Sequence, residues 1–192
     1  MASILQAKNV TLRELGDRFG FLLTEDASFF PEWQLDLPEV TPAEQQRLDR
    51  VKSSFSNLLE YPPLLENTVK MVVLSPLLDM ADFYLPPFHI KSEPSTELTL
   101  EDEGMLIRGQ LDVLVLRDLI WVVAIESKNA EFSLEAGRAQ LLSSMLANPP
   151  APRYGLSRVF DLFNPGHDLY EVLKILKSLK ERIIRPTGNG TL

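Results

Sequence analysis

Hydrophobic residues recur at helical spacing in two stretches that begin with the same polar signature. After Thr41-Pro42-Ala43-Glu44, the residues Leu48, Val51 and Phe55 fall on one stripe of a helix. The threonine can cap the helix, the proline suits its first turn, and the glutamate three residues after the threonine completes a capping box. Thr11-Leu12-Arg13-Glu14 has the same form. The pattern therefore predicts one helix beginning at Leu12 and another at Pro42.

Three later segments also carry helical periodicity. The first covers 64–74 and continues over 77–82 after an interruption at Pro76, because proline removes a helical hydrogen bond. The second covers 134–146, with Ser133 as its cap. The third covers 168–184, where leucines, isoleucine and valine form one stripe and lysines occupy the other side. A frayed tail is expected over 186–192.

Between these helices the chain has runs that are typical of β-strands. The runs cover 88–92, 97–100, 105–116 and 119–128. The last two are apolar on both faces, which favours a sheet covered by helices on two sides. Arg117-Asp118 joins them at hairpin length. With the turn centred there, Asp112 is expected opposite Val123 and close to Glu126. A further, weak strand candidate covers 154–160.

Length and composition favour one domain. The chain has 192 residues, of which 45% are hydrophobic and 24% charged, which is ordinary for a single globular domain over 1–192. Within it we distinguish an N-terminal extension (1–61), a core (62–148), a C-terminal segment with its helix (149–185) and the tail (186–192). No run of about 18 apolar residues and no signal-peptide pattern is present, so we expect a soluble cytoplasmic protein without membrane contact.

Charge narrows the partners that this chain would bind. The formal net charge is −8, which argues against holding nucleic acid by bulk electrostatics. The charge is uneven, because residues 1–103 carry 18 acidic and 8 basic side chains whereas residues 104–192 carry 9 and 11. A polyanion would therefore meet the C-terminal half. The chain has no cysteine and two histidines, so a metal would be held mainly by oxygen ligands.

One ordered set of residues carries chemistry. Glu66 stands in a predicted helix, Asp112 in a predicted strand, Glu126 and Lys128 at the end of the next strand, and Gln140 in a predicted helix. Alternation along a strand places Glu126 and Lys128 on one face, and an antiparallel neighbour brings Asp112 beside them. Mg²⁺ or Mn²⁺ would suit two adjacent carboxylates, with the Ser127 carbonyl and water completing its shell. Lys128 would serve the attacking water and the phosphate, while Glu66 and Gln140 would support the metal and the lysine.

This arrangement resembles the PD-(D/E)XK nuclease superfamily. The match comprises the helix with Glu66, Gln110-Leu111-Asp112, Ile125-Glu126-Ser127-Lys128 and the helix with Gln140. It is similar to the N-terminal nuclease domain of type I restriction endonuclease motor subunits and to stand-alone cyanobacterial restriction endonuclease-like proteins. The resemblance implies an α/β fold of restriction endonuclease type, a mixed β-sheet flanked by helices. It also implies Mg²⁺-dependent cleavage of DNA, with Asp112 and Glu126 as metal ligands.

The sequence departs from the superfamily pattern at two points. Leu111 stands where proline commonly precedes the first acid, and 154–160 is the only candidate for the strand expected after the Gln140 helix. A missing strand would leave the sheet edge short or supplied by another subunit. A homodimer is compatible with this class, because one centre cuts one strand.

Two other readings stay open. One is a nuclease fold kept as a catalytically inactive binding or assembly module, whose acidic half contacts protein partners. The other is a metal-dependent hydrolase of a smaller phosphoester. Neither is separated from a nuclease by the sequence alone.

Overall fold

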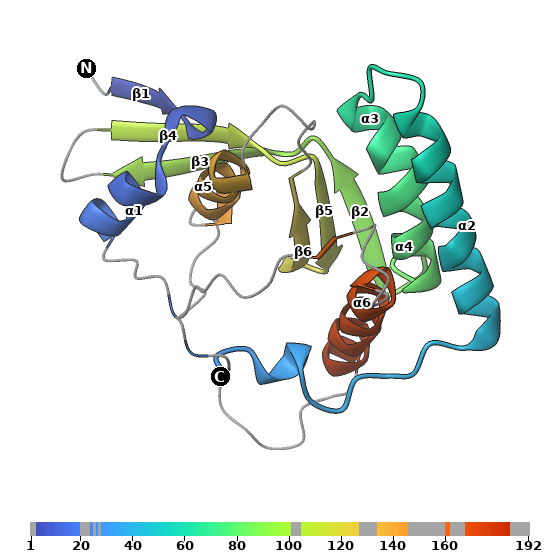
Figure 1. Cartoon of the computed structure of the whole chain (residues 1–192). Coiled ribbons are helices and arrows are strands. Elements are labelled where there is room, and N and C mark those ends of the chain that lie inside the picture. Colours follow the sequence, from blue (N-terminus) through green and yellow to red (C-terminus); the bar gives the residue numbers. More distant parts are fainter. Residues whose placement is uncertain are drawn as a thin grey trace. The chain divides into compact units, whose positions relative to one another are not determined.

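The chain forms two compact units, which we describe from a computed structural model (Figure 1). The structure describes residues 3–19, 24, 26, 28–100, 105–126, 134–145, 160–161 and 168–184. The first unit comprises 1–25 and 90–156, and the second comprises 26–89 and 157–192. The sequence favours a single domain, and that division of the chain stays a prediction.

The first unit contains a mixed three-stranded sheet. Its strands are β1 (Ser3–Gln6), β4 (Met105–Gln110) and β3 (Ser95–Leu100), in the order β1-β4-β3. β1 runs parallel to β4, and β3 runs antiparallel to it. The hydrophobic pattern does not predict β1, because a strand of four residues is too short to show a period.

A second three-stranded sheet has the order β2-β5-β6, with β2 (Phe88–Ser92), β5 (Val113–Arg117) and β6 (Ile120–Ile125). The chain passes from the first sheet to the second at Leu111 and Asp112. The Leu111 N–H donates to the Pro94 carbonyl, whereas the Asp112 N–H donates to the Ile125 carbonyl, each at 3.1 Å.

Consecutive residues at this point thus bond to different neighbours. The prediction of one strand over 105–116 is therefore wrong. Two small sheets replace the single mixed sheet, while the α/β class is confirmed.

The β5–β6 hairpin turns one residue later than expected. Asp118 and Leu119 form the turn between the strands, and Asp118 has a φ of 56°, which primed hairpin turns accommodate. A register shift next to Val115 adds a further offset. Val115 pairs with Val123, and Val113 pairs with Ile125. The expectation that Asp112 lies opposite Val123 is therefore wrong.

The helices of the first unit pack on one another and on its strands. A short 3₁₀ helix (Ala7–Asn9) follows β1, and α1 (Leu12–Phe19) begins with the predicted capping box. In that box, Glu14 accepts from the Thr11 N–H at 2.8 Å and donates its own N–H to the Thr11 hydroxyl at 3.2 Å. α5 (Leu134–Met145) contacts the 3₁₀ helix, α1, β3, β4 and β6.

Gly109 of β4 lets α5 and the 3₁₀ helix approach the first sheet closely. A methyl group on Gly109 would lie 2.8 Å from the Ser144 hydroxyl, 2.8 Å from the Thr96 hydroxyl and 2.9 Å from Ala7 Cβ. Thr96 and Ser144 are buried and share a hydrogen bond of 3.2 Å, which joins β3 to α5. The absence of a side chain at Gly109 therefore sets the spacing between sheet and helix.

The second unit is helical. α2 (Pro42–Leu59) carries the predicted capping box of Thr41 and Glu44, and α6 (Asp168–Ile184) has the predicted bounds. α3 (Glu66–Val69), a π-helical turn (Lys70–Leu74) and α4 (Ser75–Met80) follow one another without a break. α6 packs on α2, on α4 and on a 3₁₀ turn over Pro31–Trp33.

The π-helical turn explains how helix continues through Pro76. A proline has no N–H to donate, and its ring clashes with the carbonyl four residues earlier. The wider turn over Lys70–Leu74 immediately precedes the segment that holds Pro76 at its start. Because a π-helical turn displaces the carbonyls of the regular ladder, the helix accommodates the ring there.

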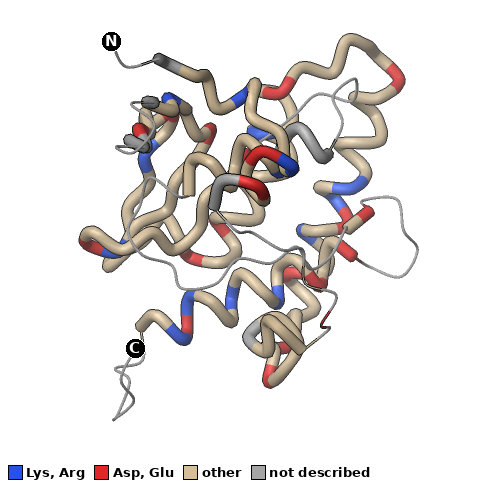
Figure 2. The backbone as a smooth tube through the Cα atoms, turned by 90° about the vertical axis from the view of Figure 1, so that its left-hand side faces the viewer, with Lys and Arg blue, Asp and Glu red and all other residues tan. Residues whose placement is uncertain are grey.

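The lysines of α6 contact acidic partners in their own unit. Basic residues recur along the helix that leads to the C-terminus (Figure 2). Lys177 lies 2.9 Å from Glu44, and Lys180 lies 2.7 Å from Asp82. Their charges are thus largely neutralised within the fold.

No helix in the described part of the chain combines the length and the apolar character needed to cross a membrane. The Ser133 cap, nearly all of the 154–160 strand candidate and the tail at 186–192 lie outside the described residues.

Candidate active site

The change of sheet fixes the position of Asp112. Its N–H donates to the Ile125 carbonyl at 3.1 Å, and its carbonyl accepts from the Glu93 N–H at 3.0 Å. The backbone of Asp112 is therefore tied to β6 on one side and to the turn between β2 and β3 on the other. Directly before it, Leu111 is fully buried and anchors the segment in the core.

Asp112 and Glu126 occupy the same end of the β5–β6 ladder. The last pair of the ladder is Val113 with Ile125, and Asp112 and Glu126 are the residues next to that pair, just outside β5 and β6. The register thus ends between these two residues, and both of them line one hollow.

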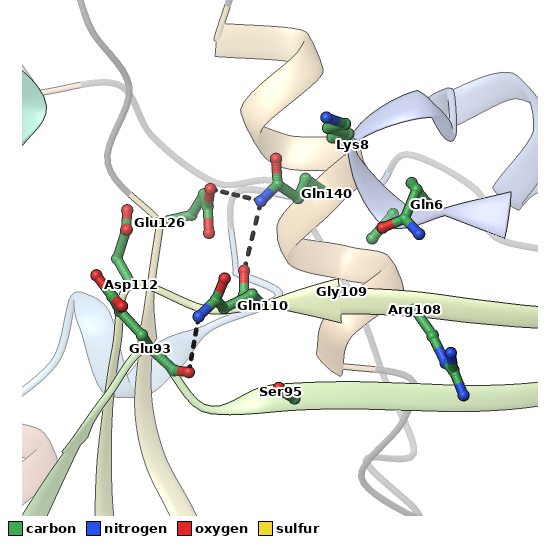
Figure 3. A pocket seen from close by; sticks show the side chains of 11 residues that line it. Gln6, Lys8, Glu93, Ser95, Arg108, Gly109, Gln110, Asp112, Glu126 and Gln140 are labelled. Atoms are coloured by element: carbon green, nitrogen blue, oxygen red, sulfur yellow. Dashed lines mark hydrogen bonds between the residues drawn. The ribbon is translucent and has the colours of Figure 1, made fainter.

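Gln140 joins α5 to this pair. Its Nε2 atom donates to Oε1 of Glu126 at 2.6 Å and makes a long contact of 3.5 Å with the carbonyl of Gln110 (Figure 3). Gln110 in turn donates from its side chain to the Glu93 carbonyl at 3.0 Å. Two amide side chains thus connect α5, β4 and the β2–β3 turn around the carboxylates.

These residues line a hollow of about 430 Å³ within the first unit. Three carboxylate residues, Glu93, Asp112 and Glu126, gather at one end of it, and Lys8 and Arg108 lie at the other (Figure 3). The Oε2 atom of Glu126 is buried. Several like charges at one end repel one another, so a cation bound there would stabilise them.

The structure brings together three of the five residues that the sequence singled out. Asp112, Glu126 and Gln140 line the same hollow. Glu66 is the first residue of α3 and belongs to the second unit. Lys128, together with the Ser127 carbonyl, lies outside the described residues.

The donor chemistry of the hollow fits a hard divalent cation. Among the described residues, no group of three acidic or histidine side chains has a geometry that could hold a metal ion. Mg²⁺ does not need such a cage, because it keeps several waters and is often bound by one or two carboxylates together with substrate phosphates. Asp112 and Glu126 supply two such carboxylates at one face.

Eight of the eleven residues that line the hollow were not singled out as site residues from the sequence. Glu93 and Gln110 line the hollow because they lie where the chain passes from one sheet to the other. Gln6 and Lys8 line it because β1 and the 3₁₀ helix after it form part of its wall. Glu93 has a φ of 53°, which is uncommon for a residue with a side chain and marks a tight turn. The only signal in the sequence was the Glu93-Pro94 pair between two predicted strands.

Comparison of the chain with protein-family models, with curated proteins and with solved structures finds no match. The functional assignment consequently depends on the geometry of the hollow and on the residue pattern.

Proposed function

We propose that this protein is a metal-dependent nuclease that hydrolyses phosphodiester bonds of DNA in the hollow of the first unit. The observation that carries the proposal is the position of Asp112 and Glu126, one step beyond the last pair of the β5–β6 ladder and lining a common hollow with Gln140. The same residues form the pattern that resembles the PD-(D/E)XK superfamily.

The residues would divide the work as follows. Asp112 and Glu126 would hold Mg²⁺ or Mn²⁺, which polarises a scissile phosphate and promotes ionisation of a bound water when present. Gln140 holds the Glu126 carboxylate in one orientation through the 2.6 Å hydrogen bond. Lys128, two residues after Glu126, would orient the water and balance charge that develops on the phosphate.

The chemistry of the hollow supports a charged substrate. The described residues that line it carry carboxylates, amides, a hydroxyl and two cations, and among them Ala7 and Gly109 alone have no polar side chain. An apolar ligand would find little surface to bury in it. A phosphate group can accept hydrogen bonds from the amides and can share a cation with the carboxylates.

A cleavage assay with matched variants tests the proposal. Supercoiled plasmid is incubated with Mn²⁺ or Mg²⁺ and with wild type, Asp112→Asn, Glu126→Gln, Lys128→Ala or Asp118→Asn. Asp118 is an exposed acid in the β5–β6 turn, and asparagine also adopts a positive φ such as the one found there. Asp118→Asn is therefore the control. We expect the control to cleave like wild type and the three site variants to lose cleavage by about a hundredfold or more.

Equal cleavage by all five proteins would indicate a contaminant and overturn the proposal. Absence of cleavage together with absence of Mn²⁺ binding in calorimetry would instead favour the inactive binding or assembly module. Far-ultraviolet circular dichroism shows whether each variant is folded.

A further inference from the structure

The end of the hollow opposite the carboxylates is built by the N-terminal segment. Lys8 lies in the 3₁₀ helix Ala7–Asn9, immediately after β1, where Gln6 pairs with Arg108 of β4. Ala7 is buried in the core beside Val10, and α5 packs on the same helix. The backbone of Lys8 is therefore held in place by the sheet and by α5, although its side chain is exposed.

The hollow is larger than a hydrated cation requires. A shell of six waters occupies about 180 Å³, since each water takes about 30 Å³. The hollow measures about 430 Å³. The hollow, which both the carboxylates and Lys8 line, therefore has room for a further group of the substrate.

The two cations at this end differ in how far their charge is already balanced by acidic partners. Arg108 is 2.9 Å from Glu97 of β3, so much of its charge is already balanced. Lys8 makes no ion pair with any residue that the structure describes. The ammonium of Lys8 is the better candidate for an incoming anion.

We propose that Lys8 binds a backbone phosphate of the DNA strand next to the phosphate that lies at the carboxylate end. The inference rests on the proposed function and extends it, because it makes the substrate a strand with at least two phosphates. A chain with a net charge of −8 cannot attract DNA by its overall electrostatic field. The affinity for DNA must therefore come from local contacts, such as one between a phosphate and Lys8 at the hollow. A nucleoside monophosphate, with a single phosphate, would not engage both ends.

A binding experiment without divalent ions tests this role separately from cleavage. The background is Asp112→Asn with Glu126→Gln, which removes two negative charges from the hollow. Into it we introduce Lys8→Gln or, as a matched control, Lys91→Gln. Lys91 is an exposed lysine of β2 in the same unit that does not line the hollow. Fluorescence anisotropy with an oligothymidylate of about ten nucleotides, in EDTA and over a series of salt concentrations, gives the affinity and its salt dependence.

We expect Lys8→Gln to weaken binding about five- to tenfold. The slope of log affinity against log salt should become shallower by about 0.7, the value for one phosphate contact on a single strand. Lys91→Gln should change neither quantity. Equal behaviour of the two variants, or no detectable binding in the parent background, would overturn the role of Lys8.

Cleavage by the wild type is measured independently of this experiment. A wild type that does not cleave, combined with a Lys8-dependent affinity, would reject the nuclease and keep the binding site. A wild type that cleaves, combined with equal affinities for the two lysine variants, would keep the nuclease and reject the role of Lys8.

Discussion

Gln140 on α5 donates a hydrogen bond of 2.6 Å to Glu126 at the end of β6. The contact joins the end of β6 to α5, the helix that follows β6 in the chain. It also fixes one oxygen of a carboxylate whose other oxygen is buried. The amide thus contributes to the orientation of the carboxylate.

Gln140→Ala should therefore lower kcat/KM for DNA cleavage by about 10- to 100-fold, which is typical for residues that orient a metal ligand. The loss arises because Glu126 would lose a hydrogen bond that helps to orient its carboxylate. Cleavage kinetics and Mn²⁺ titration calorimetry measure the effect. Gln46→Ala, at an exposed position of α2, is the control and should leave both unchanged. Wild-type kinetics in Gln140→Ala would contradict the orienting role.

Gly109→Ala should destabilise the protein by about 1–3 kcal/mol through overpacking. The new methyl group would lie 2.8 Å from both the Ser144 and the Thr96 hydroxyls, which are buried and hydrogen-bonded to each other. Urea unfolding followed by circular dichroism gives the free energy of unfolding. An unchanged midpoint would mean that α5 and β4 can separate without cost.

Thr41→Ala should cost about 1 kcal/mol of stability, because α2 loses the hydroxyl that accepts from the Glu44 N–H. Thr41→Ser keeps the oxygen and is the matched variant. Both are compared with wild type by urea unfolding at neutral pH. Equal losses for alanine and serine would indicate that the methyl group, and not the cap, matters.

Glu44 gives the stability of the second unit a dependence on pH. Burial raises the pKa of Glu44, but hydrogen bonds from Lys177 and Thr41 outweigh burial and hold the pKa below its ordinary value. A carboxyl with a lowered folded-state pKa stabilises the fold above its unfolded pKa and loses that contribution as the pH falls through the folded value.

The difference in unfolding free energy between wild type and Glu44→Gln should accordingly be largest at neutral pH and shrink below pH about 4.5. Urea titrations at pH about 7 and pH about 3.5 measure it. A difference that stays constant over this range would contradict the contribution of the Lys177 and Thr41 contacts.

Local signals in the sequence predicted the helices well. The capping boxes at Thr11 and Thr41 begin α1 and α2, and the stripe over 168–184 gives the bounds of α6, all of which the structure confirms. These elements are specified by residues within a few positions of one another. Their signals are therefore visible in one sequence.

Long-range pairing could not be predicted in the same way. The stretch 105–116 contains no proline, and Gly109 lies before the break, so nothing local marks Leu111 and Asp112 as the point where the chain changes sheets. That change is set by hydrogen bonds to Pro94 and Ile125, which are distant in the sequence. The order of Asp112, Glu126 and Gln140 in the sequence identified these residues as candidates. No sequence pattern pointed to Lys8, because its place at the hollow depends on the long-range pairing of β1 with β4.

The crossing of the chain between sheets at Leu111 and Asp112 makes the two ends of the hollow separately adjustable. The position of Asp112 and Glu126 follows from the β5–β6 ladder, whereas the position of Lys8 follows from the pairing of β1 with β4. In the proposed nuclease, lengthening or shortening β1 would change which part of the DNA strand is bound and leave the position of the carboxylates unchanged. The proposed binding of the DNA strand and the proposed hydrolysis could then be altered separately, by engineering different parts of one small unit.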